Sequence, residues 1–189
     1  MYFNRLKSIV IACLLVSLMS CAAAPTHLIV SPQVNLSPSN QLSGKEVQLN
    51  VIDMRTSPHI IQILKKDDAA TILSSEQRLE DIIQDVLAKQ WPGQGLVFSP
   101  AAKNKITVSI EKAIVSVNQK RVSYTTQSEI IIKVSINNNE QTLTNLFKNR
   151  AHNEGALNAD IAALEREFNK HLSTVLEQLL ISKDIKTFL

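Results

Sequence analysis

Apolar side chains alternate with polar ones along residues 45–53, and those on one face are Val47, Leu49 and Val51. This period of two predicts a half-buried β-strand. Two apolar runs follow, at residues 59–64 and 70–73, with the charged residues 65–68 between them. Runs of this length on either side of a polar turn predict a hairpin of two antiparallel strands.

The pattern then changes to a helical one. Ser74 and Gln77 have the spacing of a capping box, which predicts the start of a helix. Apolar residues recur at helical spacing after it, namely Leu79, Ile82, Ile83, Val86 and Leu87. We expect this helix to end near Gln90, because stop signals come next at Pro92, Gly93 and Gly95.

Three further strands are predicted after this helix. Residues 105–117 alternate, but the apolar positions change parity near Glu111 and Lys112, which predicts a β-bulge. Residues 122–136 keep apolar side chains at even positions, from Val122 and Tyr124 to Ile136. The opposite face of this strand is polar, with Ser123, Thr125, Gln127, Glu129, Lys133 and Ser135. After an asparagine turn, residues 141–151 predict the next antiparallel strand, with Leu143 and Phe147 facing the core.

The last element is a long helix. Asn158 is a plausible N-cap, and one apolar stripe follows it through Ile161, Leu164, Phe168, Leu172, Val175 and Leu179. The helix would have about 24 residues and a length of roughly 36 Å at 1.5 Å per residue. The element order predicts an α+β fold in which two helices pack on one face of an antiparallel sheet and the other face stays open.

The first 21 residues have the pattern of a bacterial lipoprotein signal. Arg5 and Lys7 precede an apolar stretch at residues 9–19, and Ser20 and Cys21 follow it. A small residue before a cysteine is what cleavage and lipid transfer to the thiol require. The other two interpretations are an ordinary cleaved signal and a retained anchor, although the apolar stretch is short for a membrane span. We expect residues 1–20 to be removed and Cys21 to carry lipid.

Residues 21–44 are expected to form the lipidated N-terminus and an extended tether, since they contain prolines 25, 32 and 38. At about 3.1 Å per residue, such a tether would reach about 70 Å. The apolar residues 27–30 could instead dock as an edge strand. Residues 45–189 are expected to form a single periplasmic domain.

Composition narrows the functional classes. Removing Arg5 and Lys7 from the 20 basic residues leaves 18 against 17 acidic ones, so the mature domain is nearly neutral. This balance does not suggest a nucleic-acid partner or a polybasic membrane patch. Cys13 leaves with the signal and Cys21 carries lipid, so no thiol remains for a disulfide, a metal or catalysis. Lipid would then be the only membrane contact.

Motifs for catalysis are not apparent. No glycine-rich phosphate loop follows a strand, and the four histidines lack metal-ligand spacing, so we expect no catalytic residue and no metal site. One segment stands out: Asp53, Arg55 and Thr56 end the first strand, with Asp53 and Arg55 on the same side. They form either a strand-end ion pair or a binding site. Trp91, at the helix end, is either part of the core edge or a binding anchor.

Several of these features together resemble the YajG family of proteobacterial lipoproteins. They are Cys21, the Asp53-x-Arg55-Thr56 strand end, residues 86–90, the strand through Tyr124 and the Glu154–Gly155 pair. The resemblance covers nearly the whole mature chain. It implies an outer-membrane lipoprotein on the periplasmic face, with no cofactor besides the lipid on Cys21 and no established catalytic residues. Ala22 supports the outer membrane, because Asp at this place retains lipoproteins in the inner membrane.

Three functional hypotheses follow. The first is a non-enzymatic component of envelope assembly or maintenance, which would bind an envelope protein through a sheet edge or the open face. The second is an auxiliary lipoprotein that binds lipid or lipopolysaccharide in an apolar groove between helices and sheet. The third, an envelope hydrolase, requires distant side chains to converge in the fold.

Overall fold

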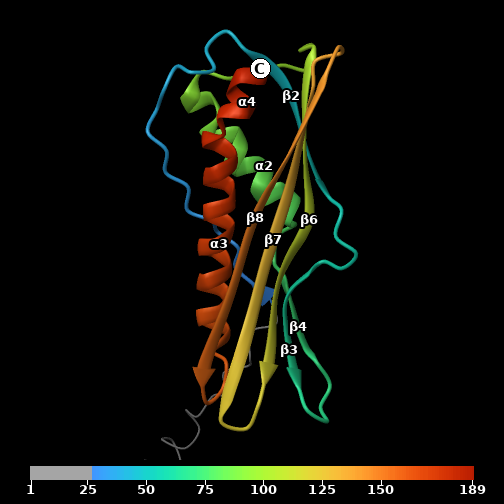
Figure 1. The fold of residues 1–189 in the computed structure, drawn as a ribbon, viewed down its shortest axis with the longest axis vertical. Coiled ribbons are helices and arrows are strands. Elements are labelled where there is room, and N and C mark those ends of the chain that lie inside the picture. Colours follow the sequence, from blue (N-terminus) through green and yellow to red (C-terminus); the bar gives the residue numbers. More distant parts are fainter. Residues whose placement is uncertain (1–26) are drawn as a thin grey trace, which may run out of the picture.

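The structure is a computed structural model that describes residues 27–189. Two main helices, α2 (Leu79–Gln90) and α3 (Ile161–Ile181), lie on the same side of an elongated sheet, and the short α4 (Lys183–Phe188) continues from α3 (Figure 1). The strands are β1 (His27–Leu28), β2 (Glu46–Asp53), β3 (His59–Lys65), β4 (Thr71–Ser75), β5 (Val97–Phe98), β6 (Asn104–Gln119), β7 (Ser123–Asn137) and β8 (Thr142–Ala156). The predicted α+β class with two helices is confirmed.

The sheet is mixed, whereas the sequence predicted an antiparallel one. β6, β7 and β8 are antiparallel, and so are β3 and β4, which form the predicted hairpin. However, β2 and β3 both run parallel to β6, one after the other along the same edge. Alternation indicates which face of a strand is buried, but it contains no information about strand direction. Residues 54–58 connect β2 to β3, and β3 continues along β6 in the same direction as β2.

The predicted bulge in β6 is confirmed. The pairing of β6 with β7 shifts register between Ile110 and Lys112, so Glu111 is the extra residue. The side chains of Ile106, Val108 and Ile110 are buried before it, and those of Ala113, Val115 and Val117 are buried after it. The extra residue therefore returns the second apolar set to the same core.

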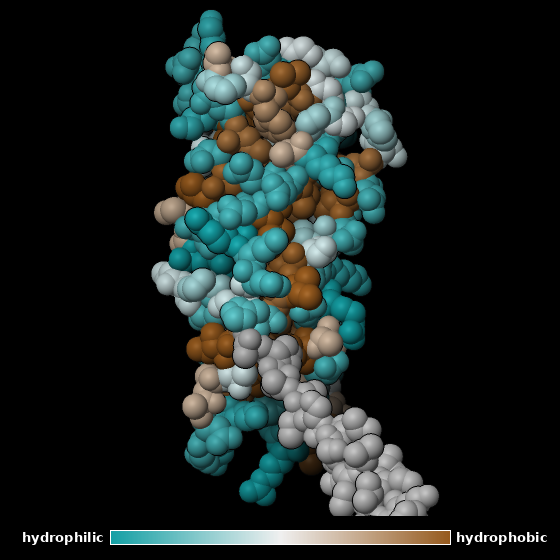
Figure 2. All heavy atoms as spheres, turned by 180° about the vertical axis from the view of Figure 1, so that it is seen from behind, coloured by the Kyte–Doolittle hydropathy of each residue, from teal (hydrophilic) through white to brown (hydrophobic). Residues whose placement is uncertain are grey.

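The two faces of the sheet differ as predicted. The even positions of β7 from Thr126 to Ile136 are buried under the helices, while the odd positions face the open side. Val122 is an exception, because it lies in the turn before β7 and is exposed. Seen from behind, the molecule is mostly hydrophilic with separate hydrophobic patches (Figure 2).

The helix starts differ from the predicted ones. Ser74 and Ser75 belong to β4, so they cannot cap α2, whose N-cap is Arg78 without a side-chain cap. The predicted end at Gln90 is confirmed. The N-cap of α3 is Asp160, not Asn158, and its carboxylate accepts a hydrogen bond from the Ala162 N–H. None of the described helices is long and apolar enough to cross a bilayer.

Residues 27–44, which we expected within the tether, lie against the domain. Their apolar side chains at Leu28, Val30, Val34 and Leu42 are buried, and β1 pairs with β4, as in the docked alternative for residues 27–30. A proline-rich composition favours extended backbone, but extended backbone can also follow a protein surface and bury alternate side chains. The packed unit thus includes residue 27. Residues 1–26, with Cys21 and Ala22, lie outside the described part.

Candidate functional site

The segment that the sequence singled out contains a closely bonded ion pair. Arg55 Nε and Nη2 donate to the two carboxylate oxygens of Asp53 at 2.9 and 2.7 Å, and Arg55 Nη1 donates to the Ala113 carbonyl at 3.3 Å. Only 6% of the Arg55 side chain and 19% of the Asp53 side chain are exposed. The structure therefore supports the strand-end ion pair. Thr56 is exposed and points to no comparable network.

This pair joins β2 to β6 just past the bulge, where β2 ends. Burial alone would raise the pKa of the Asp53 carboxyl, but the hydrogen bonds and the charge of Arg55 outweigh it and hold that pKa below its ordinary value. Asp53 is consequently ionised in the folded protein near neutral pH. Its arrangement is that of a structural pair.

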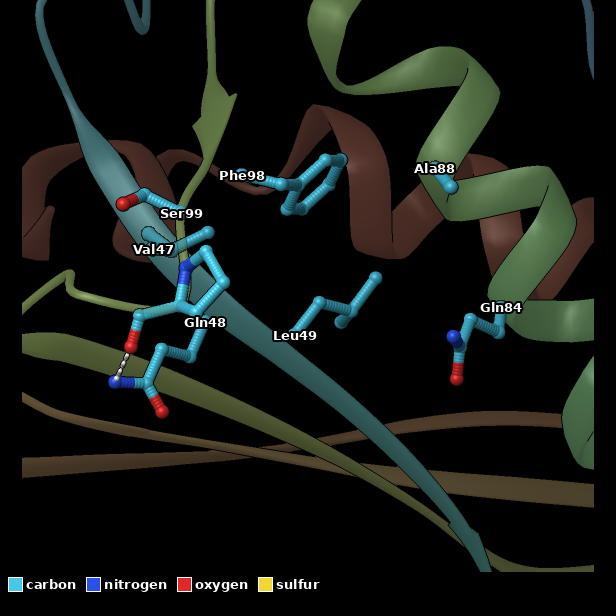
Figure 3. A pocket seen from close by; sticks show the side chains of 8 residues that line it. Val47, Gln48, Leu49, Gln84, Ala88, Phe98 and Ser99 are labelled. Atoms are coloured by element: carbon cyan, nitrogen blue, oxygen red, sulfur yellow. Dashed lines mark hydrogen bonds between the residues drawn. The ribbon is translucent and has the colours of Figure 1, made fainter.

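A cleft of about 470 Å³ lies beside β2 and is visible in close-up in Figure 3. Leu49 and Phe98 extend into the space between β2 and α2, and Ala88 and Gln84 face it from α2 (Figure 3). The remaining lining residues are Val47, Gln48, Ser99 and Pro100. The lining is thus largely apolar, with amides and a hydroxyl at its rim, which is typical of a binding cleft.

The inner wall of this cleft is held by Trp91, which is fully buried and packs at a tilt against Phe98, with ring centroids 6.4 Å apart. Of the two roles considered for Trp91, the core one is therefore correct. The turn after Trp91 docks on the segment before β2, since Leu42 N–H donates to the Gln94 carbonyl. Gly95 has φ +92°, and a Cβ there would lie 2.7 Å from Ser43 Oγ, so this close approach requires glycine.

The main-chain edge of β2 borders the same cleft. β5 pairs only with Glu46 and Val47, and it ends before Pro100, which has no N–H to donate. Lys45 and Val47 carbonyls accept from Val97 and Ser99 on this side.

Because main-chain groups alternate along a strand, the N–H and C=O of Leu49 and Val51 also point to this side. Among residues 27–189, no strand pairs with that stretch of the edge. We call the main-chain edge from Leu49 to Val51 the free β2 edge.

The open face carries a charged cluster around Glu129. Its carboxylate lies 2.5 Å from Lys112 Nζ and 2.5 Å from Arg150 Nε, so it links β6, β7 and β8. The Lys112 hydrogen bond outweighs burial and holds the pKa of Glu129 below its ordinary value. A second pair joins Lys133 to Glu111 in the bulge. All five of these charged residues belong to the sheet itself, so the cluster links its strands.

The histidines lie apart from one another. His171 Nδ1 lies 3.0 Å from Ser128 Oγ, between α3 and β7, and burial lowers its pKa. Its side chain is half-buried, because this position of α3 faces β7 at the edge of the buried stripe. His59 contacts Ser57, and His152 lies 3.6 Å from Glu154. In the described part of the chain no three potential ligands gather as a metal site would require.

The sequence did not predict the cleft, because one element that forms it, β5, was missed. β5 has only two residues, and a pair such as Val97–Phe98 is too short to show a period. The signal that could have revealed it is the apolar pair just before Ser99 and Pro100, where a strand must stop. The free β2 edge was also hidden, because it depends on how few residues β5 covers.

Comparison with known proteins identifies the family of this chain and a solved structure with the same fold. A family model, Lipoprotein_16, described as "Uncharacterized lipoprotein", matches residues 32–189. Two curated relatives, both named "Uncharacterized lipoprotein YajG", come from Escherichia coli K12 and E. coli O6:H1, and each is 25% identical over 175 residues, covering 91% of this chain and 90% of the relative. The crystal structure of protein XCC0632 from Xanthomonas campestris has the same fold, with a TM-score of 0.58 at 14% identity, covering 88% of this chain and 97% of that one. The chain therefore belongs to the YajG family of lipoproteins.

Proposed function

We propose that this protein is a lipid-anchored, non-enzymatic component of the periplasmic face of the outer membrane that binds an extended segment of an envelope protein at the free β2 edge. The observation that carries the proposal is the unpaired main chain of Leu49, which lines an apolar cleft, with Val51 next along the same edge. An exposed strand edge recruits an extended peptide through main-chain hydrogen bonds, and adjacent pockets select its side chains.

The bound segment would continue the line of β5 along β2. It would be short, because the free β2 edge spans residues 49–51 beyond the part that β5 covers, about 10 Å at 3.3 Å per residue. Its side chains on the helix side would meet Leu49, Phe98 and Ala88, so an apolar residue at alternate positions fits best. Gln84 and Ser99 at the rim can hydrogen-bond its polar groups.

Two further observations support the anchored, periplasmic setting. The family is one of lipoproteins, and Cys21 follows a leader with the pattern that lipidation requires. Ala22, not Asp, comes after it.

In-cell photocrosslinking tests this function. A photoreactive residue at Gln84, exposed at the cleft rim, is expected to capture a discrete envelope protein, identified by mass spectrometry. The same residue at Lys89, exposed on α2 outside the cleft lining, is the matched control. Filling the cleft with Ala88→Trp should abolish the adduct.

Three results would contradict the proposal. The first is an equal adduct from both positions, and the second is an adduct that survives Ala88→Trp. The third is capture of phospholipid or lipopolysaccharide alone, which would favour the auxiliary lipid-binding hypothesis.

A further inference from the structure

Two turns at the lower end of the molecule in Figure 1 lie side by side. They are the β3–β4 turn and the β6–β7 turn, and both line one surface hollow of about 730 Å³. The residues around this hollow are Lys66, Asp67, Asn118, Gln119, Lys120 and Arg121. The basic side chains of Lys66 and Lys120, 54 residues apart in the sequence, thus meet at one end of the sheet.

Exposed apolar side chains accompany these basic ones. Val122 is 72% exposed and Leu157 is 70% exposed, and the Leu157 N–H donates to the Val122 carbonyl at 2.9 Å. Leu157 has φ +63°, a left-handed conformation that is unfavourable for a residue other than glycine. Gln119, which is buried, holds it there by donating to the Leu157 carbonyl at 2.8 Å. The fold therefore fixes an exposed leucine in a strained position beside an exposed valine.

We call Lys66, Lys120, Arg121, Val122 and Leu157 the basic tip. Among the charged side chains that line the hollow, three are basic, namely Lys66, Lys120 and Arg121, and one is acidic, Asp67. Exposed acidic side chains nearby are Asp68, Glu154 and Asp160, so the excess of positive charge is confined to the hollow itself. The fold creates this excess by bringing the β6–β7 turn beside Lys66.

The first described strand limits how far this tip can lie from the anchor. β1 is fixed on both sides, because the Glu76 N–H donates to the Leu28 carbonyl and the Ile29 N–H donates to Glu165 on α3. Asn169 on α3 binds the same segment through the Ile29 carbonyl and the Ser31 N–H. The segment after residue 27 is therefore held against the domain and does not lengthen the tether.

The chain between Cys21 and His27 is no longer than the distance from β1 to the tip. His27 is in register with Ser74, which pairs with His59. From His59 to the end of β3 at Lys65 is six residues, about 20 Å. Cys21 is also six residues from His27 and can lie at most about 20 Å from it. An anchor at Cys21 consequently keeps the tip within reach of the bilayer surface.

We propose that the basic tip docks on the membrane surface, with Val122 and Leu157 at the level of the lipid headgroups and the basic side chains against anionic phospholipid. The inference rests on the proposed lipid anchor at Cys21 and extends it. Amphipathic side chains at an interface bind through buried apolar area and through attraction to anionic lipid, and both are present here. Docking would direct the long axis of the sheet away from the membrane and present the cleft to the periplasm.

Depth-dependent fluorescence quenching tests the docking. The full lipidated protein is reconstituted in vesicles of phosphatidylethanolamine and phosphatidylglycerol that contain headgroup spin labels, with a fluorophore on Val122→Cys. Cys13 is removed with the signal and the Cys21 sulfur carries lipid, so the introduced thiol is the reactive one. Leu146→Cys, exposed in the half of β8 far from the tip, is the matched control.

We expect strong quenching at Val122 and little at Leu146. Lys120→Gln and Arg121→Gln should each lower the ratio of docked to undocked protein about fivefold, and phosphatidylcholine in place of phosphatidylglycerol should lower it further. Equal quenching at both positions in protein that floats with the vesicles would overturn the docking while leaving the anchor intact. Quenching at Val122 that stays the same in both charge variants and in phosphatidylcholine vesicles would also overturn it. Protein that fails to float would overturn the anchor and the docking with it.

Discussion

The Asp53–Arg55 pair lies where β2 leaves the sheet and the bulge of β6 begins. Arg55 contacts both elements, through Asp53 on one side and the Ala113 carbonyl on the other. Removing one member of a buried pair leaves the other charge without compensation, which costs more than the pair itself contributes. Here the pair is near the surface, so the effect should be moderate.

Arg55→Met should therefore lower the free energy of unfolding by about 2–4 kcal/mol. Arg55→Lys keeps the charge but loses the bidentate contact with Asp53, so it should lower the free energy of unfolding by about half as much. Urea denaturation followed by circular dichroism measures both. An Arg55→Met protein as stable as the wild type would show that the pair does not join the strands.

His171 links stability to pH. Burial lowers its pKa below 6.5, more strongly than Glu167 raises it, and Lys170 lowers it further; the Ser128 hydroxyl faces it from β7. The unfolded chain therefore takes up a proton near pH 6.5, where the folded protein does not. The neutral ring contributes stability above this pH, and the contribution is lost as pH falls toward the folded pKa.

The melting temperature of the wild type should thus decrease between pH 7 and pH 5 more than that of His171→Gln, whose side chain does not titrate. Thermal denaturation at several pH values compares the two proteins. A parallel decrease in both would contradict the lowered pKa of His171.

At the scale of elements, much of the fold follows from local pattern. The even positions of β7, the bulge at Glu111 and the apolar stripe of α3 were all predicted, because each depends on the period of a single segment. The reason for glycine at residue 155 was not predicted in this way, because it depends on a second strand: Gly155 lies opposite Tyr124, and a Cβ there would be 2.4 Å from the tyrosine ring.

The parts that were not predicted depend on contacts between distant segments. The parallel pairing of β2 and β3 with β6 and the packing of residues 27–44 are of this kind. So is the candidate site, because the free β2 edge exists only where β5 stops. Asp53 and Arg55 were predicted as a pair from their spacing, but the sequence could not reveal their contact with Ala113 across the sheet.

The bulge provides a test at this scale. Deleting Glu111 would move Ala113, Val115 and Val117 to the open face, so the deletion should unfold the domain or lower its melting temperature severely. Glu111→Ala keeps the register and removes only the pair with Lys133, so it should cost about 0–1 kcal/mol. Circular dichroism melts compare the two, and a deletion variant that melts like wild type would refute the role of the bulge.

At the scale of the whole molecule, the first described strand, β1, and the free β2 edge lie at different places on the domain. The chain enters near β1, runs along α3 to the top of the molecule in Figure 1 and only then enters β2. The cleft beside β2 and α2 is therefore in the half of the sheet remote from the basic tip. A membrane-docked tip and a bound segment at the cleft do not compete for space.

The destination of the lipoprotein is testable through Ala22. Ala22→Asp should move the protein from the outer to the inner membrane, because Asp after the lipidated cysteine acts as a retention signal. Sucrose-gradient fractionation of the two membranes measures the shift, with Ala22→Ser as the control. An unchanged outer-membrane fraction for Ala22→Asp, or a wild-type protein in the inner membrane, would contradict the proposed location.

Amide hydrogen exchange at single residues tests the free β2 edge most directly. In the free protein, Gln48 and Asn50 N–H groups bond to β6 and should exchange slowly, while those of Leu49 and Val51 should exchange fast. When the crosslinked partner or its segment is added, the Leu49 and Val51 amides should become protected as well. Fast exchange of these two amides in the bound state, or full protection of them in the free protein, would contradict strand addition at this edge.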